Sequence, residues 1–145
     1  MKRKYHKGCV ENLNDPGPYT KTHPIYPMKD KVEKPWGSYE VLLSEPKYVI
    51  KRIIVKPEQR LSYQYHGYRD ETWVLIEGCG DVTINGETRY LDSTENPIHI
   101  LRGELHRVTN TLNDRDLVFI EIQTGDKLDE ADIIRLEDDY GRADK

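Results

Sequence analysis

Four polar side chains have spacings that suit a single metal site. Gln64 and His66 are two residues apart, Glu71 follows five residues later, and His106 lies well downstream. On a β-strand, residues i and i+2 point to the same face, so Gln64 and His66 can converge on one ion. A tight turn at Gly67 would return Glu71 on the neighbouring strand. A lone histidine on an apolar strand is more often a core residue, but these groups together favour a metal site.

The donor set indicates the kind of metal and its use. Two imidazoles, one carboxylate and one amide oxygen make a mixed nitrogen and oxygen site. Zn²⁺ is the expected ion for such a set, and Co²⁺, Mn²⁺, Ni²⁺ or Fe²⁺ also fit. Protein ligands that leave coordination positions open are typical of catalytic sites rather than structural ones.

Short β-rich runs separated by turn residues must position these ligands. Residues 33–145 predict one all-β domain, because regularly spaced strands without intervening helices are typical of an antiparallel sandwich or barrel. Asn85-Gly86 predicts a type I′ hairpin turn, since both central positions need a positive φ. Residues 129–136 alone have a helical pattern, which predicts a short helical C-terminal tail. Residues 1–32 hold several prolines and no periodic pattern, which predicts an extended N-terminal arm.

Composition and charge exclude several classes of protein. The net charge of −4 gives no basic footprint for nucleic acid, and no apolar run is long enough for a membrane span or a secretion signal. Cys9 and Cys79 fit no C-x-x-C pattern and predict no disulfide framework, as in a reducing cytoplasm, which is the expected location. A homodimer is expected, because the arm could cover a strand edge and dimers are the commonest oligomers.

Two motifs resemble those of the cupin family. Pro57-Glu58, Gln64-x-His66, Glu71 and Gly78 follow the first cupin motif, and Gly103-x-x-His106-x-x-x-Asn110 resembles the second. Further segments are similar to the cupin domain of type II mannose-6-phosphate isomerases. They are KPWGSYE at 34–40, QRLSYQYH at 59–66, ETW at 71–73, GELHR at 103–107 and RLEDDYGR at 135–142. The last of these is the most specific, because the cupin pattern alone accompanies many chemistries.

The resemblance implies a cupin jelly-roll β-barrel and an activity that interconverts mannose 6-phosphate and fructose 6-phosphate. It also implies that Arg69, Arg135 and Arg142 match arginines important for that activity. Without the resemblance, the acidic residues around Arg135 and Arg142 would make both arginines surface ion-pair partners. In the family this module is often joined to a sugar-1-phosphate nucleotidyltransferase, which needs a glycine-rich loop and a much longer chain. The first 33 residues hold neither, so a stand-alone isomerase without guanylyl transfer is expected.

An isomerase that converts an aldose into a ketose needs three kinds of group. A Lewis acid stabilises the C1 and C2 oxygens, a base moves a proton between these carbons, and cations hold the phosphate. Lys51, Glu137 and Tyr140 are the candidate bases, and water activated by the metal is a further alternative. Arg69 and Arg107 are the preferred phosphate ligands, because they adjoin motif residues and arginine suits bidentate contacts with oxyanions.

Four departures from the family pattern leave the metal ligands intact. Glu58 stands where glycine is usual, Gly67-Tyr68 replaces a histidine-rich turn, Thr72 replaces a histidine implicated in activity, and Leu101 replaces a proline. By strand alternation Thr72 is expected to face away from the ligands. These changes keep two alternatives open besides the sugar-phosphate isomerase. One is an isomerase or epimerase of another sugar or sugar phosphate, and the other is a cupin that binds a sugar without turnover.

Overall fold

The computed structural model describes residues 31–144. The regular secondary structure of this part of the chain consists of strands and one short 3-10 helix at Ser93–Glu95. The strands are β1 (Lys31–Lys34), β2 (Gly37–Glu45), β3 (Tyr48–Val55), β4 (Tyr63–Tyr65), β5 (Asp70–Glu77), β6 (Gly80–Ile84), β7 (Glu87–Leu91), β8 (Ile98–Ile100), β9 (His106–Asn110), β10 (Leu117–Thr124) and β11 (Ile134–Glu137).

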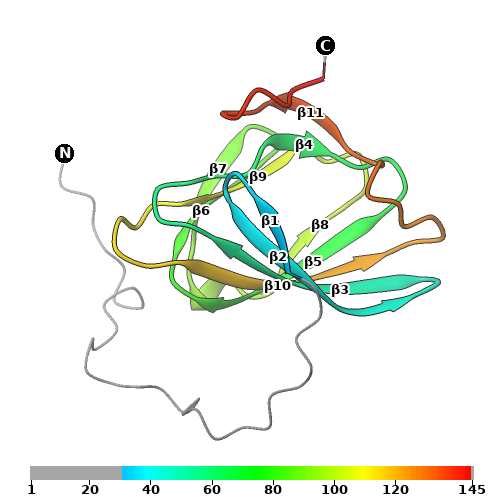
Figure 1. Ribbon diagram of the computed structural model, residues 1–145, viewed down its shortest axis with the longest axis horizontal. Helices are drawn as coiled ribbons and strands as arrows, with labels where there is room; N and C mark the ends of the chain where they lie inside the picture. The colour runs from blue at the N-terminus through cyan, green and yellow to red at the C-terminus, as the bar shows by residue number, and fades with distance from the viewer. Residues whose placement is uncertain (1–30, 145) are drawn as a thin grey trace, which may run out of the picture.

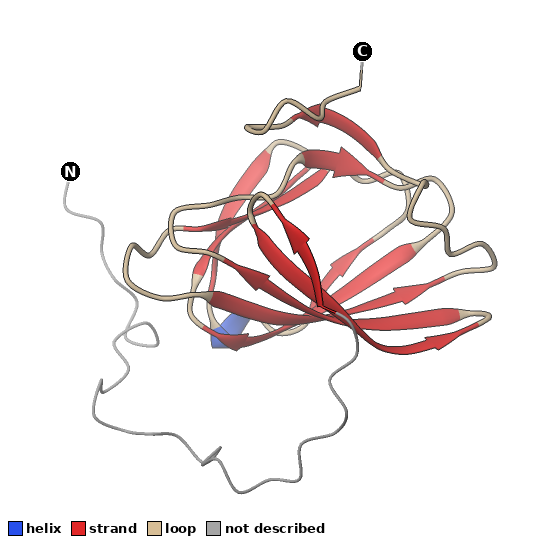
Figure 2. Ribbon diagram, in the orientation of Figure 1, coloured by secondary structure: helices blue, strands red, loops and turns tan. Residues whose placement is uncertain are grey.

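Two antiparallel sheets face each other and close into a barrel (Figure 1). The six-stranded sheet has the order β1-β2-β3-β10-β5-β8, and the five-stranded sheet has the order β11-β4-β9-β6-β7. From β4 onward the chain crosses repeatedly from one sheet to the other, and Figure 2 shows how completely strands form the walls. The all-β jelly-roll barrel predicted from the sequence is confirmed.

The core lies between the sheets because strand side chains alternate between two faces. On β10 every second residue is buried, so that Leu117 and Phe119 point inward while their neighbours are only half-buried. Phe119 pairs in register with Ile53 of β3 and Leu75 of β5. Its ring also packs on Trp73, with the ring centroids 4.8 Å apart. This end of the barrel is therefore a continuous apolar core.

The same inward row becomes polar toward the other end of the barrel. Glu121 on β10 lies opposite Lys51 of β3, and Gln123 lies opposite Glu71 of β5. All four side chains are buried. Burying ionisable groups costs free energy unless they are paired or hydrogen-bonded, so a cluster of them marks this end as a functional site.

Two turns show how local residues shape the barrel. Asn85 has φ +48° and Gly86 has φ +81°, and they join β6 to β7 with Ile84 opposite Glu87. The predicted type I′ hairpin is confirmed. Glu58 has φ +61°, which is the left-handed region that glycine adopts most easily. The backbone therefore keeps the conformation typical of glycine at this family position, although the residue is glutamate.

The C-terminal segment differs from the sequence prediction. Residues 134–137 form β11, which pairs with β4 at the edge of the five-stranded sheet, so the predicted helical tail is wrong. Asp129 closes a turn instead of starting a helix: its carboxylate accepts from the Ala131 amide and its carbonyl accepts from the Asp132 amide. A helix of about eight residues is marginal by itself, whereas a strand gains hydrogen bonds from its neighbour.

Two further expectations fall partly outside the described residues. β1 crosses the predicted boundary between arm and domain after residue 32 and pairs with β2, whereas residues 1–30 of the predicted arm lie outside the described range. Cys79 is fully buried and disulfide-bonded, so the expectation of unpaired cysteines is wrong for this residue. Cys9 lies outside the described range. Within residues 31–144, no helix has the length and apolar character needed to cross a membrane.

Candidate metal centre and adjoining pocket

Two histidines present the same ring nitrogen to one point between the sheets. His66 follows β4 and His106 begins β9, the neighbouring strand. Nδ1 of His66 lies 2.7 Å from the carbonyl oxygen of Asp132, and Nδ1 of His106 lies 2.8 Å from the carbonyl oxygen of Glu104. A carbonyl only accepts, so each Nδ1 donates a proton and Nε2 of the neutral ring keeps its lone pair. Both rings are therefore oriented as metal ligands.

Glu71 reaches the same point from the opposite sheet. Its Oε1 lies 3.1 Å from Nε2 of His66, and its Oε2 lies 3.6 Å from Nε2 of His106. Arg69 donates from Nε to Oε1 at 3.0 Å, and Trp73 donates from Nε1 to Oε2 at 3.1 Å. Burial opposes ionisation, but the neighbouring His66, His106 and Arg69 outweigh it and hold the pKa of Glu71 well below its usual value. The group is thus a carboxylate ready to bind a cation.

One unpaired nitrogen and the close approach of three ligand groups fit a divalent metal ion. Burial lowers the pKa of His106 and keeps its ring neutral, the form that binds metals. Among the described residues, Nε2 of His106 is buried without a hydrogen-bond partner. One ligand atom each from His66, Glu71 and His106 lie within 4.8 Å of one another. A bound cation would supply the partner that the Nε2 lone pair of His106 lacks.

Gln64 lies beside the cluster with its amide oxygen turned away. Its Oε1 accepts from Oγ of Ser62 at 2.5 Å, while its Nε2 faces Nε2 of His66 at 3.4 Å. A half-turn of the amide would present the oxygen to the cluster, and the Ser62 hydroxyl would then accept from the amide nitrogen. Gln64 is also the register partner of His106. The structure thus brings the fourth predicted ligand next to the other three.

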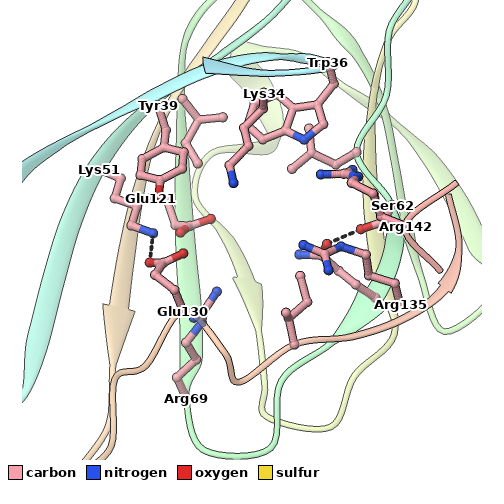
Figure 3. Close-up of a pocket in the computed structure, with 14 residues that line it drawn as sticks. Lys34, Trp36, Tyr39, Lys51, Ser62, Arg69, Glu121, Glu130, Arg135 and Arg142 are labelled. Carbon is pink, nitrogen blue, oxygen red and sulfur yellow. Dashed lines mark hydrogen bonds and ion pairs between the residues drawn. The ribbon is translucent and has the colours of Figure 1, made fainter. Parts of the chain in front are cut away.

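A pocket opens beside this cluster (Figure 3). Gln64 and Arg69 link it to the metal ligands, and Trp36, Tyr39, Ile53, Leu61 and Ile133 supply apolar wall. Its cationic lining residues are Lys34, Lys51, Arg69, Arg135 and Arg142, and its carboxylates are Glu121 and Glu130. The excess of positive charge suits an anionic ligand.

Arg135 and Arg142 belong to this pocket and are not merely surface ion-pair partners. Asp138 accepts from Nε of Arg142 at 2.9 Å and from its Nη2 at 2.8 Å, and these hydrogen bonds lower the pKa of Asp138. The bidentate pair fixes the guanidinium of Arg142. Nε of Arg135 is buried without a partner among the described residues. Figure 3 shows both guanidinium groups directed into the pocket.

Three predicted site residues do not reach the pocket. Arg107 follows His106 on β9 and therefore points to the other face of the strand. It donates to the carbonyl of Leu61 at 2.9 Å and to the carboxylate of Glu137 at 3.3 Å. Tyr140 packs against the hydrophobic core. The structure therefore does not support phosphate binding by Arg107 beside the metal, or a catalytic base at Glu137 or Tyr140.

Contacts with neighbouring residues show the surroundings of Lys51, a candidate base, and the orientation of Thr72. Lys51 lines the pocket, but its ammonium group donates to the carboxylate of Glu130 and lies 4.4 Å from the ring centroid of Tyr39. Thr72 faces away from the metal ligands, as predicted, and its hydroxyl lies 3.2 Å from Nδ1 of His99. Position 72 therefore contributes no side chain to the inside of the barrel.

The sequence prediction missed Glu121 and Lys34 as pocket residues. A signal for Glu121 was present, because it occupies an inward position in the alternating row that starts at Leu117 and Phe119. A carboxylate in such a row is either paired in the core or exposed to a cavity. Lys34 ends β1, and nothing in its local pattern marks it as a pocket residue.

Comparison with known proteins identifies the family. Residues 21–138 match the family described as "Mannose-6-phosphate isomerase C-terminal". The chain belongs to this family. It is 42% identical over 115 residues to "Mannose-1-phosphate guanylyltransferase ManC" of Salmonella typhimurium, covering 79% of this chain and 24% of that protein. It is 40% identical over 112 residues to "Xanthan biosynthesis protein XanB" of Xanthomonas campestris, covering 77% of this chain and 24% of that protein. This member of the family thus spans about a quarter of these relatives.

Solved structures bear on the fold of this family member. CapF, a capsular polysaccharide assembling protein of Staphylococcus aureus, superposes with a TM-score of 0.67 at 21% identity, over 78% of this chain and 35% of that chain. KdgF from Halomonas sp. superposes with a TM-score of 0.61 at 14% identity, over 68% of this chain and 89% of that chain. At such identities the likeness shows the shared β-barrel alone.

Proposed function

We propose that this chain is a metal-dependent isomerase that interconverts mannose 6-phosphate and fructose 6-phosphate. The observation that supports it most is the buried His66–Glu71–His106 cluster opening onto a cationic pocket, in a chain of the mannose-6-phosphate isomerase family. A divalent ion, with zinc as our proposal, would be held by these residues and by Gln64 after rotation of its amide. Such an ion supplies Lewis-acid polarisation of the C1 and C2 oxygens of a sugar.

Cationic side chains in the wall of the pocket suit the substrate phosphate. Lys34 and Arg135 come from β1 and β11, and both point into the pocket together with Arg142 (Figure 3). The buried, unpaired Nε of Arg135 would gain a partner from an oxyanion. We therefore assign the phosphate to these three residues in place of Arg107. Arg69 remains at the metal end, where it neutralises Glu71.

A coupled assay of metal-loaded and chelated protein tests this proposal. The panel contains mannose 6-phosphate, other hexose and pentose phosphates, and free mannose. We expect turnover of mannose 6-phosphate only with metal, and much slower turnover of free mannose, which lacks the anion that the pocket cations would bind. His106→Gln should lower turnover by roughly 100-fold or more, because it removes a ligand atom.

A second histidine provides the matched control. His99 lies on β8 and contacts Thr72 outside the cluster, so His99→Gln should keep wild-type turnover. Full activity of chelated wild type or of His106→Gln would contradict the metal-dependent reaction. If the enzyme preferred a different sugar phosphate, the proposed substrate would be wrong, but the proposed metal dependence would stand. Sugar binding by calorimetry without turnover of any panel member would favour a sugar-binding cupin.

A further inference from the structure

We propose that Glu121 is the catalytic residue that carries a proton between C1 and C2 of the sugar, a role that rests on the isomerase function proposed above. The position of Glu121 on its strand directs its carboxylate into the pocket. Glu121 points inward from β10, lines the pocket and is 5% exposed. Its strand neighbour in register on β5 is Trp73, two residues from the metal ligand Glu71. A sugar whose C1 and C2 oxygens face the metal cluster would thus present the adjoining carbon atoms toward this side of the pocket.

Glu121 is the pocket carboxylate that remains available as a base. The other one, Glu130, has a side chain 62% exposed and is paired with Lys51. Lys51 donates a proton in that pair, so it acts as a donor and a positive charge rather than as a base. Glu137 and Tyr140 lie outside the pocket lining. Among the described residues that line the pocket, Glu121 therefore combines burial, an acceptor oxygen and access to the substrate.

The surroundings of Glu121 suit a group that gains and loses a proton near neutral pH. Burial raises its pKa to about 7, and the charge of Glu71 on β5 adds to the rise. Lys51 on β3, Arg69 before β5 and the hydrogen bond from Gln123 on its own strand oppose it. Nε2 of Gln123 donates to Oε1 at 2.7 Å, which orients the carboxyl group. Lys34 and Tyr39 face the same pocket from β1 and β2. A base works best when its proton affinity lies near the working pH.

The proton transfer balances without any added reagent. The Glu121 carboxylate takes the hydrogen on C2 of the aldose as a proton, and the electron pair of the C2–H bond forms a C1=C2 double bond while the C1 carbonyl oxygen becomes an oxyanion. The neutral Glu121 carboxyl then returns the proton to C1, using the C1=C2 pair to make the new C1–H bond. The hydroxyl proton of C2 passes to the C1 oxygen as the C2 carbonyl forms. C2 is oxidised and C1 is reduced within one molecule.

Steady-state kinetics of the metal-loaded Glu121→Gln variant tests the role. We expect kcat for mannose 6-phosphate to fall by about 100- to 10,000-fold with little change in KM and unchanged bound metal, because the amide keeps the shape but accepts no proton. Glu40→Gln is the matched control. Glu40 is a buried glutamate on β2 that pairs with Arg52 outside the pocket, and its amide variant should keep wild-type kcat.

The pH profile separates a catalytic role from a structural one. In the wild type, kcat should fall as the pH drops, because protonated Glu121 can no longer accept the proton from the sugar. Glu121→Asp retains a carboxylate at a different depth, so it should shift the acidic side of the pH profile of kcat. If Glu121→Gln does not fold, Glu121→Asp tests the catalytic role instead. Wild-type kcat in Glu121→Gln, or an unshifted pH profile with wild-type kcat in Glu121→Asp, overturns the role while leaving the isomerase function intact. An inactive wild type overturns both.

Discussion

Glu71 and Glu121 are buried glutamates on adjacent strands, yet their environments move their proton affinities in opposite directions. Glu71 contacts Arg69 and His66, and these partners outweigh the cost of burial. Glu121 accepts a hydrogen bond from the neutral amide of Gln123 and lies near the negative charge of Glu71, so burial dominates. The pKa of Glu71 is therefore lowered, as suits the proposed metal ligand, and that of Glu121 is raised, as suits the proposed base.

At the residue scale, Glu121→Gln should change the dependence of stability on pH. Between the unfolded pKa of 4.5 and the folded pKa of about 7, the folded chain binds more protons than the unfolded chain, so the free energy of unfolding falls as pH rises. The glutamine variant lacks this loss. Measured with chelator by denaturant unfolding, the variant should gain about 1–3 kcal/mol on the wild type between pH 5 and pH 8. If the difference in the free energy of unfolding between variant and wild type stays constant or shrinks from pH 5 to pH 8, the raised pKa of Glu121 is contradicted.

At the element scale, the segment between β10 and β11 holds the turn that carries His66. The Asp132 carboxylate accepts from the amide of Gly67 at 2.8 Å and from the amide of Tyr68 at 2.9 Å. The Asp132 carbonyl accepts from Nδ1 of His66. A segment distant in sequence thus fixes both the turn between β4 and β5 and the orientation of a predicted metal ligand.

Asp132→Ala should loosen this turn and weaken metal binding. Removing the carboxylate leaves two backbone donors without their charged acceptor, which should lower the free energy of unfolding by about 1–3 kcal/mol. Because the orientation of His66 depends on the same segment, zinc affinity should fall by about 10- to 100-fold in a chelator competition titration. Asp126→Ala, which changes an exposed aspartate of the same segment, is the control and should leave both values near the wild type. Unchanged zinc affinity in Asp132→Ala would show that the segment does not orient His66.

At the scale of the whole molecule, the proposed metal links the two sheets. His66 and His106 belong to the five-stranded sheet side, whereas Glu71 lies on β5 of the six-stranded sheet. An ion that binds these three residues would therefore join the two walls of the barrel. It would bind the folded chain alone and stabilise it in proportion to its affinity and concentration.

Zinc should accordingly raise the melting temperature of the protein. At a free concentration 100-fold above Kd the gain is about 2.7 kcal/mol, which corresponds to roughly 5–15 °C for a chain of this size. Differential scanning fluorimetry with zinc and with chelator measures it. His106→Gln should show a much smaller shift, and His99→Gln should match the wild type. An equal rise in the melting temperature of His106→Gln would show that zinc binds at another site.

A homodimer remains a prediction at the same scale. Within the described residues, β1 and β8 end one sheet and β11 and β7 end the other, and strand edges are sites where a second chain can pair. Multi-angle light scattering at micromolar concentration should give twice the monomer mass of 17.0 kDa. The mass of a single chain across the whole concentration range would contradict the dimer.

Much of the fold and part of the site could be predicted from the sequence, because they depend on neighbours in the chain. Asn85-Gly86 set a hairpin through their own φ angles. Alternation along β5 put Glu71 inside and Thr72 outside. The short interval from His66 to Glu71 brought both to one site, since a single turn separates them.

The tertiary structure alone decided what surrounds those ligands. Glu121 meets Lys51 only through the register of β10 with β3, and residues 134–137 become a strand only because β4 offers a partner edge. Arg107 turned out of the barrel for the same reason, whereas Arg135 lines the pocket, a place that the sequence indicated only through the family resemblance. Local sequence patterns indicate which side chains share a face of one strand. The pairing of distant strands determines which faces meet, and with it the charge and burial that set the chemistry.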